Sequence, residues 1–141
     1  MFKLLGFAVI PAVCAVGLAA PAQAQGGYIV IAGSDSTHAV EATVGGSLAS
    51  LGDVEAYALS HCAERHGATD CRVLAEGRGG CVALSDDGRS FVGGWGPTRG
   101  AAGAAAVAKV GVAGANVDVA RCVGDPGLVS STGNFAPAAT Q

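Results

Sequence analysis

The sequence predicts the α+β fold class: two β-β-α-β halves forming a mainly antiparallel sheet, with two helices on one face and disulfides as staples. Three observations lead to this prediction. Short β-branched runs alternate with two helical patterns, the order of these segments occurs twice along the chain, and four cysteines follow an N-terminal segment typical of export signals.

Residues 1–24 have the composition of a secretory signal peptide. One basic residue, Lys3, precedes a long apolar run, and Ala22-Gln23-Ala24 supplies the small residues of a cleavage site. Pro11 interrupts the run and no charged flank follows it, which argues against a transmembrane anchor. We therefore expect cleavage after Ala24 and a secreted or periplasmic protein that is free of the membrane.

The mature chain is expected to be acidic. Removal of Lys3 leaves seven of the 8 basic residues against 11 acidic ones, a net charge near −4. An anionic chain is not attracted to phosphate backbones or anionic lipids, so nucleic acid and membrane surfaces are not expected partners. Aromatic residues are few and glycines many, so the core is built from small side chains and benefits from covalent staples.

The first half of the predicted domain, residues 28–123, follows a short linker at residues 25–27. Tyr28 to Ala32 and His38 to Val44 are β-branched runs on either side of a Gly-Ser-Asp-Ser turn, which predicts a hairpin. A helix is expected from an N-cap at Asp53 to a C-cap at Gly67. Cys71 to Ala75 is the third strand of this half.

The second half repeats this order. Gly80 to Ser85 and Ser90 to Trp95 form a hairpin around the turn sequence Asp86-Asp87-Gly88-Arg89. A helix begins at Pro97-Thr98 and ends near Val110, and Asn116 to Val123 is the last strand. Residues 124–141 lack periodicity and are expected to be a disordered tail.

The two halves align weakly but continuously, as in an internal repeat. Gly27-Tyr-Ile-Val-Ile-Ala-Gly-Ser aligns with Gly80-Cys-Val-Ala-Leu-Ser-Asp-Asp, and at the offset of the final strands Cys62 and Cys71 meet Ala108 and Val117. Because both cysteines are absent together from the second half, we expect Cys62 and Cys71 to be partners.

Four cysteines, Cys62, Cys71, Cys81 and Cys122, remain in the mature chain and form a disulfide framework typical of small exported proteins. Three pairings are possible, and spacing alone does not choose among them. If the repeat argument holds, the second pair is Cys81 with Cys122. The chain-entropy model gives roughly 2.7 kcal/mol for the first link and roughly 4 kcal/mol for the second.

The segment EAYALSHCAERHGATDCRVLAEGRGGCVALSDDGRSFVGGWG resembles a bacterial exported family, domain of unknown function 4189. The resemblance covers about Tyr28 to Val123 and rests on the order of the cysteines, a Cys-Arg-Val strand and the GGWG ending. This chain departs from the family where Ala108 and Val117 replace a second helix-strand cysteine pair. The resemblance implies export, fold and disulfides, and it transfers no active site.

The cluster HCAERHGATDC, from His61 to Cys71, also permits two functional interpretations. Cys62 and His66 are one helical turn apart and could ligate a metal with Cys71, although the tight Cys-x2-4-Cys chelate is missing. Cys62 could instead be a nucleophile with His66 as its base, although an oxidising compartment would capture a reactive thiolate. The disulfide interpretation is favoured over both.

Other candidate residues have simpler structural interpretations. His61 is expected to be half-buried on the packing stripe of the first helix, and His38 to lie on the surface. Asp86 and Asp87 are expected to shape a turn, with acid-base catalysis or calcium binding as the alternative. The glycines at 77–80 and 93–96 are not followed by the lysine of a phosphate loop. Trp95 is expected to anchor the core, with a binding patch as the alternative.

We therefore predict a noncatalytic interaction or binding module of the cell envelope or secreted space, with an unknown partner. No catalytic residue, metal or cofactor is predicted. The alternative is a small envelope enzyme that uses His61, Glu64 and His66, or a metal-binding protein that uses His61, Cys62 and His66.

Overall fold

The computed structural model describes residues 27–130. The predicted signal peptide and residues 131–141 lie outside the described residues. The elements, in order, are β1 (Tyr28–Ser34), β2 (Ala39–Val44), α1 (Leu51–His66), β3 (Arg72–Arg78), β4 (Cys81–Asp86), β5 (Phe91–Gly96), α2 (Arg99–Val110), β6 (Val117–Cys122) and β7 (Val129–Ser130). The predicted β-β-α-β order occurs twice, before β7.

The strands form two sheets, with the orders β3-β1-β2-β7 and β5-β4-β6. All pairings are antiparallel except that of β2 with β7. In each half the first strand is central, flanked by the second and third strands. The α+β class is confirmed, but each half builds its own sheet where the sequence predicts a single one.

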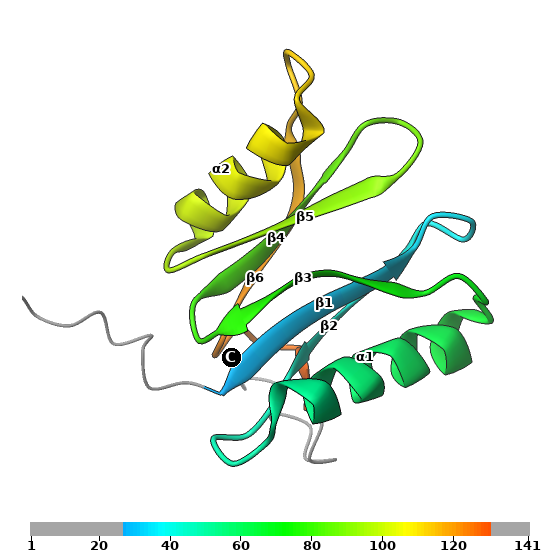
Figure 1. Cartoon of the computed structure of the whole chain (residues 1–141), viewed down its shortest axis with the longest axis vertical. Helices are drawn as coiled ribbons and strands as arrows, with labels where there is room; N and C mark the ends of the chain where they lie inside the picture. The colour runs from blue at the N-terminus through cyan, green and yellow to red at the C-terminus, as the bar shows by residue number, and fades with distance from the viewer. Residues whose placement is uncertain (1–26, 131–141) are drawn as a thin grey trace, which may run out of the picture.

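The two helices lie on opposite outer sides of the pair of sheets (Figure 1), and not on one face of one sheet as expected. The central strands explain this difference, because both of their faces are apolar. In β1, Ile29 and Ile31 pack toward β4, in a cluster with Val82 and Leu84. The alternate residues, Val30 and Ala32, pack against α1. A strand that is apolar on both faces needs cover on both, and here a sheet and a helix supply it.

Helix α2 packs directly on the glycines of β5. A Cβ atom on Gly94 would lie 2.3 Å from the backbone nitrogen of Ala106, and one on Gly96 would lie 2.6 Å from that of Ala102. The alanine-rich helix and the GGWG strand therefore fit together because neither has bulky side chains at the contact.

Local sequence signals determine both ends of helix α1. Ser50 is the N-cap of α1, not Asp53 as expected: its hydroxyl accepts a hydrogen bond from the Asp53 amide and donates to the Asp53 carboxylate. Asp53 therefore lies in the first turn, where its charge complements the helix dipole. The predicted C-cap at Gly67 is confirmed, since its φ of 62° is left-handed.

Both predicted disulfides are present. Cys62–Cys71 joins the end of α1 to the start of β3, with an S–S distance of 2.14 Å. Cys81–Cys122 joins β4 to β6, where the two residues are direct partners in the antiparallel ladder. Such bonds are typical of proteins in an oxidising compartment outside the cytoplasm.

Residues 124–130 belong to the fold, which corrects the expectation of a disordered tail from residue 124 onward. Leu128 is buried in the core between the sheets, and β7 adds Val129 and Ser130 to β2 in parallel. Asp125 fixes the intervening turn, because its carboxylate accepts bonds from the Cys122 amide and the Arg99 guanidinium. The tertiary contacts of Leu128 and Asp125 override a local composition typical of disorder.

Candidate functional site

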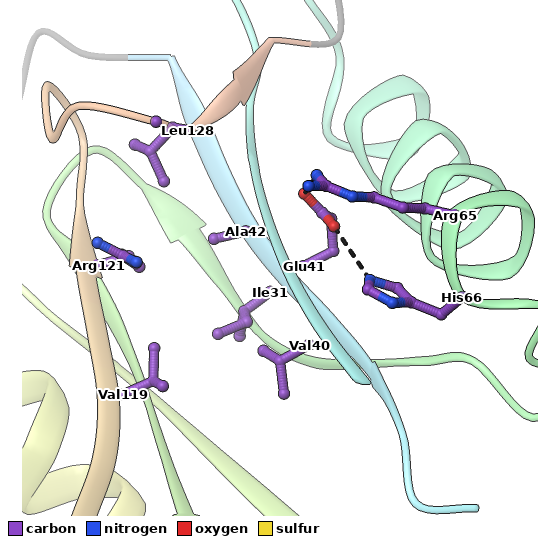
Figure 2. A pocket seen from close by; sticks show the side chains of 10 residues that line it. Ile31, Val40, Glu41, Ala42, Arg65, His66, Val119, Arg121 and Leu128 are labelled. Carbon is purple, nitrogen blue, oxygen red and sulfur yellow. Dashed lines mark hydrogen bonds and ion pairs between the residues drawn. The ribbon is translucent and has the colours of Figure 1, made fainter. Parts of the chain in front are cut away.

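A buried carboxylate lies against the last turns of α1. Glu41 projects from β2 with its side chain only 8% exposed. Its carboxylate oxygens lie 3.3 Å from Nη1 of Arg65 and 3.4 Å from Nε2 of His66 (Figure 2). Nδ1 of His61 lies 3.7 Å away. Three groups that can carry positive charge thus surround one carboxylate.

His61 is held between this carboxylate and Tyr57. The two rings stack with centroids 5.7 Å apart and an interplanar angle of 18°. Nδ1 of His61 is buried and makes no hydrogen bond with the described residues. His61 is therefore half-buried, as the helical pattern predicts, and Glu41 is its nearest acidic group.

A pocket of about 230 Å³ lies along the outer edge of β2. Strand alternation turns Glu41 toward α1, and Val40 and Ala42 toward β6 (Figure 2). Residues on both faces of β2 line the pocket. Four of them are charged or polar, and the others are apolar. The lining comprises Ile31, Val40, Glu41, Ala42, Arg65, His66, Val119, Arg121, Gly127 and Leu128.

The edge of β2 beside this pocket is open. Among the described residues, β2 pairs on its outer side only through Thr43 and Val44, which meet β7. The backbone from Ala39 to Ala42 has β1 on its inner side and no strand on the outer side. Exposed strand edges of this kind can accept a further strand.

The pocket is predominantly basic. Arg65 is compensated by Glu41, but the guanidinium of Arg121, an exposed residue of β6, makes no ion pair or hydrogen bond within residues 27–130. His66 adds a group that can be protonated. The pocket therefore favours a ligand that carries negative charge.

The structure at the end of α1 does not match either functional interpretation of this cluster, the metal site or the cysteine nucleophile. Cys62 is fully buried and disulfide-bonded, so its sulfur is not available as a nucleophile or thiolate ligand. No cluster of three or more histidine, cysteine or acidic side chains suited to a metal occurs among the described residues. The residues that line the pocket include no hydroxyl or thiol.

Glu41, and not Glu64, is the acidic partner of the histidines. Glu64 is exposed and accepts a hydrogen bond from Ser60, away from the pocket. The sequence contains a signal for Glu41, since in AVEATV it occupies an inward position of an alternating strand. A buried acid at such a position requires a cationic partner.

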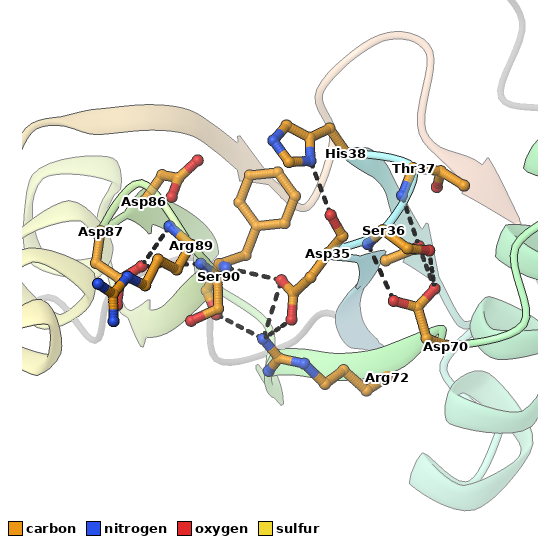
Figure 3. A network of polar contacts seen from close by, with 12 residues as sticks. Asp35, Ser36, Thr37, His38, Asp70, Arg72, Asp86, Asp87, Arg89 and Ser90 are labelled. Atoms are coloured by element: carbon orange, nitrogen blue, oxygen red, sulfur yellow. Dashed lines mark hydrogen bonds and ion pairs between the residues drawn. The ribbon is translucent and has the colours of Figure 1, made fainter.

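Asp86 and Asp87 shape the β4–β5 turn, as predicted. Asp86 accepts a hydrogen bond from the Gly88 amide, and Asp87 accepts bonds from the amides of Arg89 and Ser90 (Figure 3). These amides hold the pKa of Asp87 below its usual range. Both carboxylates thus have partners within their own turn.

A second polar network ties the β1–β2 turn to both halves (Figure 3). Asp35 accepts hydrogen bonds from the Arg72 side chain of β3 and from the Phe91 amide of β5. Asp70 accepts bonds from the hydroxyls of Ser34 and Ser36 and from the Ser36 amide, which lower its pKa to about 2. The network is structural, because each carboxylate is held by groups of the fold.

Two further predicted candidates have distinct locations. His38 is exposed, as expected, but it is the last residue of the β1–β2 turn and not part of the strand. Trp95 does not lie in the core: it is 40% exposed, and its indole rests on Gly77 with Nε1 donating to the Gly79 carbonyl at 2.9 Å. The strand alternation directs Gly94 and Gly96 onto α2, so Trp95 lies on the opposite face of β5, against Gly77 of β3.

No helix of residues 27–130 is long and apolar enough to cross a membrane. Comparisons with curated proteins and with solved structures find no match. A family model does match: it is described as "Domain of unknown function (DUF4189)" and covers residues 28–122, nearly the range of the resemblance seen in the sequence. The chain therefore belongs to the DUF4189 family.

Proposed function

We propose that the protein is an exported, noncatalytic interaction module that binds an extended acidic peptide segment at the open edge of β2. The observation that carries this proposal is the coincidence of an unpaired strand edge, Ala39 to Ala42, with a pocket lined on both sides of that strand. A peptide added to a sheet edge gains affinity from main-chain hydrogen bonds and specificity from pockets for alternate side chains.

The charges of the pocket define the peptide's chemistry. On the β6 side, Val119 and Leu128 offer apolar contact and Arg121 offers an uncompensated cation. On the α1 side, Arg65 and His66 surround Glu41. In a segment that alternates apolar and acidic side chains, all acidic side chains point to one side, and we place them toward the uncompensated Arg121. A basic segment would meet like charge there.

The direct test is an NMR titration of the ¹⁵N-labelled domain with the blocked peptide Val-Glu-Val-Glu-Val. We expect saturable shifts of the amides from Ala39 to Ala42, and none with the matched peptide Val-Lys-Val-Lys-Val. Arg121→Gln should weaken binding about tenfold, the effect of losing one charge-assisted contact. Arg89→Gln, which removes an exposed arginine of the β4–β5 turn, is the matched control.

Two results would contradict this function. One is the absence of shifts with either peptide. The other is equal binding of both peptides, or equal binding by wild type and Arg121→Gln, because the pocket's charge would then have no part in recognition.

Export is the second part of the proposal. It is supported by the signal-like segment at residues 1–24 and by the two disulfides. Intact mass of the protein recovered from outside the cytoplasm, with and without reductant, should give a chain that begins at Gln25 and two disulfides. A mass that includes residues 1–24, or free thiols, would overturn it.

We also infer that the two halves are an internal repeat. They have the same strand arrangement, and the third strand of each half has one extra residue at a comparable place: Leu74 of β3 opposite Ile31/Ala32, and Asp118 of β6 opposite Leu84/Ser85. Superposing the halves in an experimental structure tests this, because a repeat requires both bulges to coincide in one alignment.

The His66–Glu41 contact favours one alternative, a small envelope enzyme. A histidine held by a buried carboxylate can act as a general acid or base. Turnover of any substrate that is lost in His66→Ala and retained in Glu64→Gln would replace the binding function with this one.

A further inference from the structure

A second groove lies at the opposite edge of the first sheet, along β3. Its volume is about 360 Å³, and Glu55 of α1, residues 73–76 of β3, Trp95 of β5 and Lys109 of α2 line it. It shares no lining residue with the pocket beside β2. Both helices and both sheets contribute to it.

Trp95 forms a fixed aromatic surface in this groove. Its indole Nε1 donates to the Gly79 carbonyl at 2.9 Å, and the ring lies so close to Gly77 that a Cβ there would approach Nε1 to 2.0 Å. One side of the indole therefore rests on backbone. Since the residue is 40% exposed, the rest of its surface is available to a ligand.

Two carboxyl groups accompany this surface. The side chains of Glu55 and Glu76 lie against one another, and this contact, with burial, raises the pKa of Glu76. Oε2 of Glu76 is buried and has no hydrogen-bond partner among the described residues. The pair therefore offers carboxyl oxygens to a ligand that donates hydrogen bonds, including the unpartnered Oε2 of Glu76.

Lys109 supplies the remaining polar group. Its ammonium donates to the Gly93 carbonyl at 2.8 Å, which fixes its position and leaves further donors. A strand cannot add at this edge of β3, because β5 closes it: a Cβ on Gly93 would lie 2.1 Å from the Leu74 carbonyl oxygen. An extended peptide is thus excluded from the main-chain pairing that the β2 edge permits.

We propose that this groove binds a saccharide, with a sugar ring on Trp95 and its hydroxyls on Glu55, Glu76 and Lys109. A sugar ring has an apolar C–H face and a rim of hydroxyls that both donate and accept. The groove matches each feature: an aromatic plane, a carboxyl pair and an ammonium. An organic cation suits it less, because the Lys109 ammonium offsets part of the carboxylate charge.

Trp95 is the only tryptophan of the chain, so its fluorescence reports on this groove directly. We would titrate the oxidised protein with chitotriose, maltotriose and glucose, using the sorbitol-matched buffer as blank. A saturable change with a trisaccharide and none with glucose indicates a glycan chain as the ligand. A comparable change with glucose indicates a free sugar.

Substitutions then separate recognition from adventitious quenching. Glu55→Gln, on the surface of α1, should weaken binding about tenfold by removing one charged partner of the sugar hydroxyls. Glu64→Gln, on the same helix and outside the groove, should bind as wild type. Arg121→Gln should also bind as wild type, which distinguishes this proposal from the peptide function.

The saccharide proposal is overturned if no sugar changes the fluorescence of the folded protein. It is equally overturned if the change persists undiminished in Glu55→Gln. Because neither result depends on the β2 edge, each proposal stands or fails by its own measurement.

Discussion

At the scale of single residues, the pKa of Asp70 connects the β1–β2 turn to acid stability. Hydrogen bonds from Ser34 and Ser36 hold that pKa at about 2, below its ordinary value of 3.8. A carboxyl whose pKa is lower in the folded state stabilises the fold above its unfolded pKa, and this contribution is lost as the pH falls through the folded pKa. The loss therefore falls between about pH 4 and pH 2.

We predict that Asp70→Asn reduces stability at pH 6 and flattens the acid dependence between pH 4 and pH 2. Urea unfolding at several pH values measures both effects. Asp118→Asn, at an exposed position of β6, should keep the wild-type slope. A slope unchanged in Asp70→Asn would mean that the serine contacts do not persist in solution. Asp35 and Asp87, whose pKa values are also lowered, account for acid sensitivity that remains.

Individual residues also mark how much of the candidate site could be predicted from the sequence. The helical pattern places His61 on the packing stripe, and this proved right. Glu41 was not recognised, although it completes the cluster, because it lies in a strand twenty or more residues away from the histidines. A side chain's partner in another element depends on how the elements pack, and strand alternation indicates only that the acid points inward.

At the scale of elements, the contact between α2 and β5 depends on the absence of side chains. Gly94→Ala places a Cβ 2.3 Å from the Ala106 backbone, which cannot rotate away. We predict a loss of about 1–3 kcal/mol from overpacking. Gly52→Ala in α1 meets nothing within 4 Å and should stabilise by up to about 1 kcal/mol through helix propensity.

Urea unfolding of these two variants measures both effects. The comparison separates the general preference for alanine over glycine from the specific helix-strand fit. Equal effects of the same sign would show that α2 can shift away from β5 at little cost.

The two disulfides close loops of different length, so their removal should lower the free energy of unfolding by different amounts. Cys62–Cys71 closes a loop with a sequence separation of 9, and Cys81–Cys122 one of 41. In the chain-entropy model the paired alanine substitutions cost about 3 and about 4 kcal/mol respectively. Unfolding of the two double variants in urea tests the order. A greater loss for the shorter loop would indicate that packing around buried Cys62, and not loop closure, dominates.

Element types were predictable because turn and cap residues stand at their boundaries. Gly67, Thr98 and the Asp-Gly turn gave ends within one or two residues of those observed. The alignment of the final strands was less reliable. Ala32 pairs with Val73 and Ser85 with Val117, directly after the two bulges. Comparing the halves through these pairings aligns Val73, and not Cys71, with Val117. A shift of two residues keeps every side chain on the same face of a strand, so the alternation pattern does not reveal it.

At the scale of the whole molecule, the two sheets follow from the central strands. Both β1 and β4 are buried on both faces, with cores on either side. Continuous apolar runs such as Tyr-Ile-Val-Ile-Ala predict a strand covered on both sides. They do not state whether a helix or another sheet provides each cover. The single-sheet prediction therefore had the right hairpin and helix within each half, and the wrong layering.

The C-terminal segment gives the last prediction at this scale. Residues 124–130 seal the gap between the sheets: Leu128 is only 4% exposed in the central core, and β7 extends the first sheet. Burial of one leucine side chain stabilises a fold by about 1.5–3 kcal/mol. The Asp125 bonds to Arg99 and to the Cys122 amide add to this, and they anchor β6 to the start of α2.

A chain that ends at Val123 should therefore melt at least about 10 °C lower than chains that end at Ser130 or at Gln141. The expected shift follows because each kcal/mol lowers the Tm of a domain of this size by about 4–8 °C. Calorimetry of the three oxidised chains, each beginning at Gln25, makes the comparison. Leu128→Ala in the full chain is the matched point variant and should reproduce a substantial part of the shift. Equal melting temperatures for all three chains would mean that the fold closes without residues 124–130, so that the pocket beside β2 would lose Gly127 and Leu128 as fixed walls.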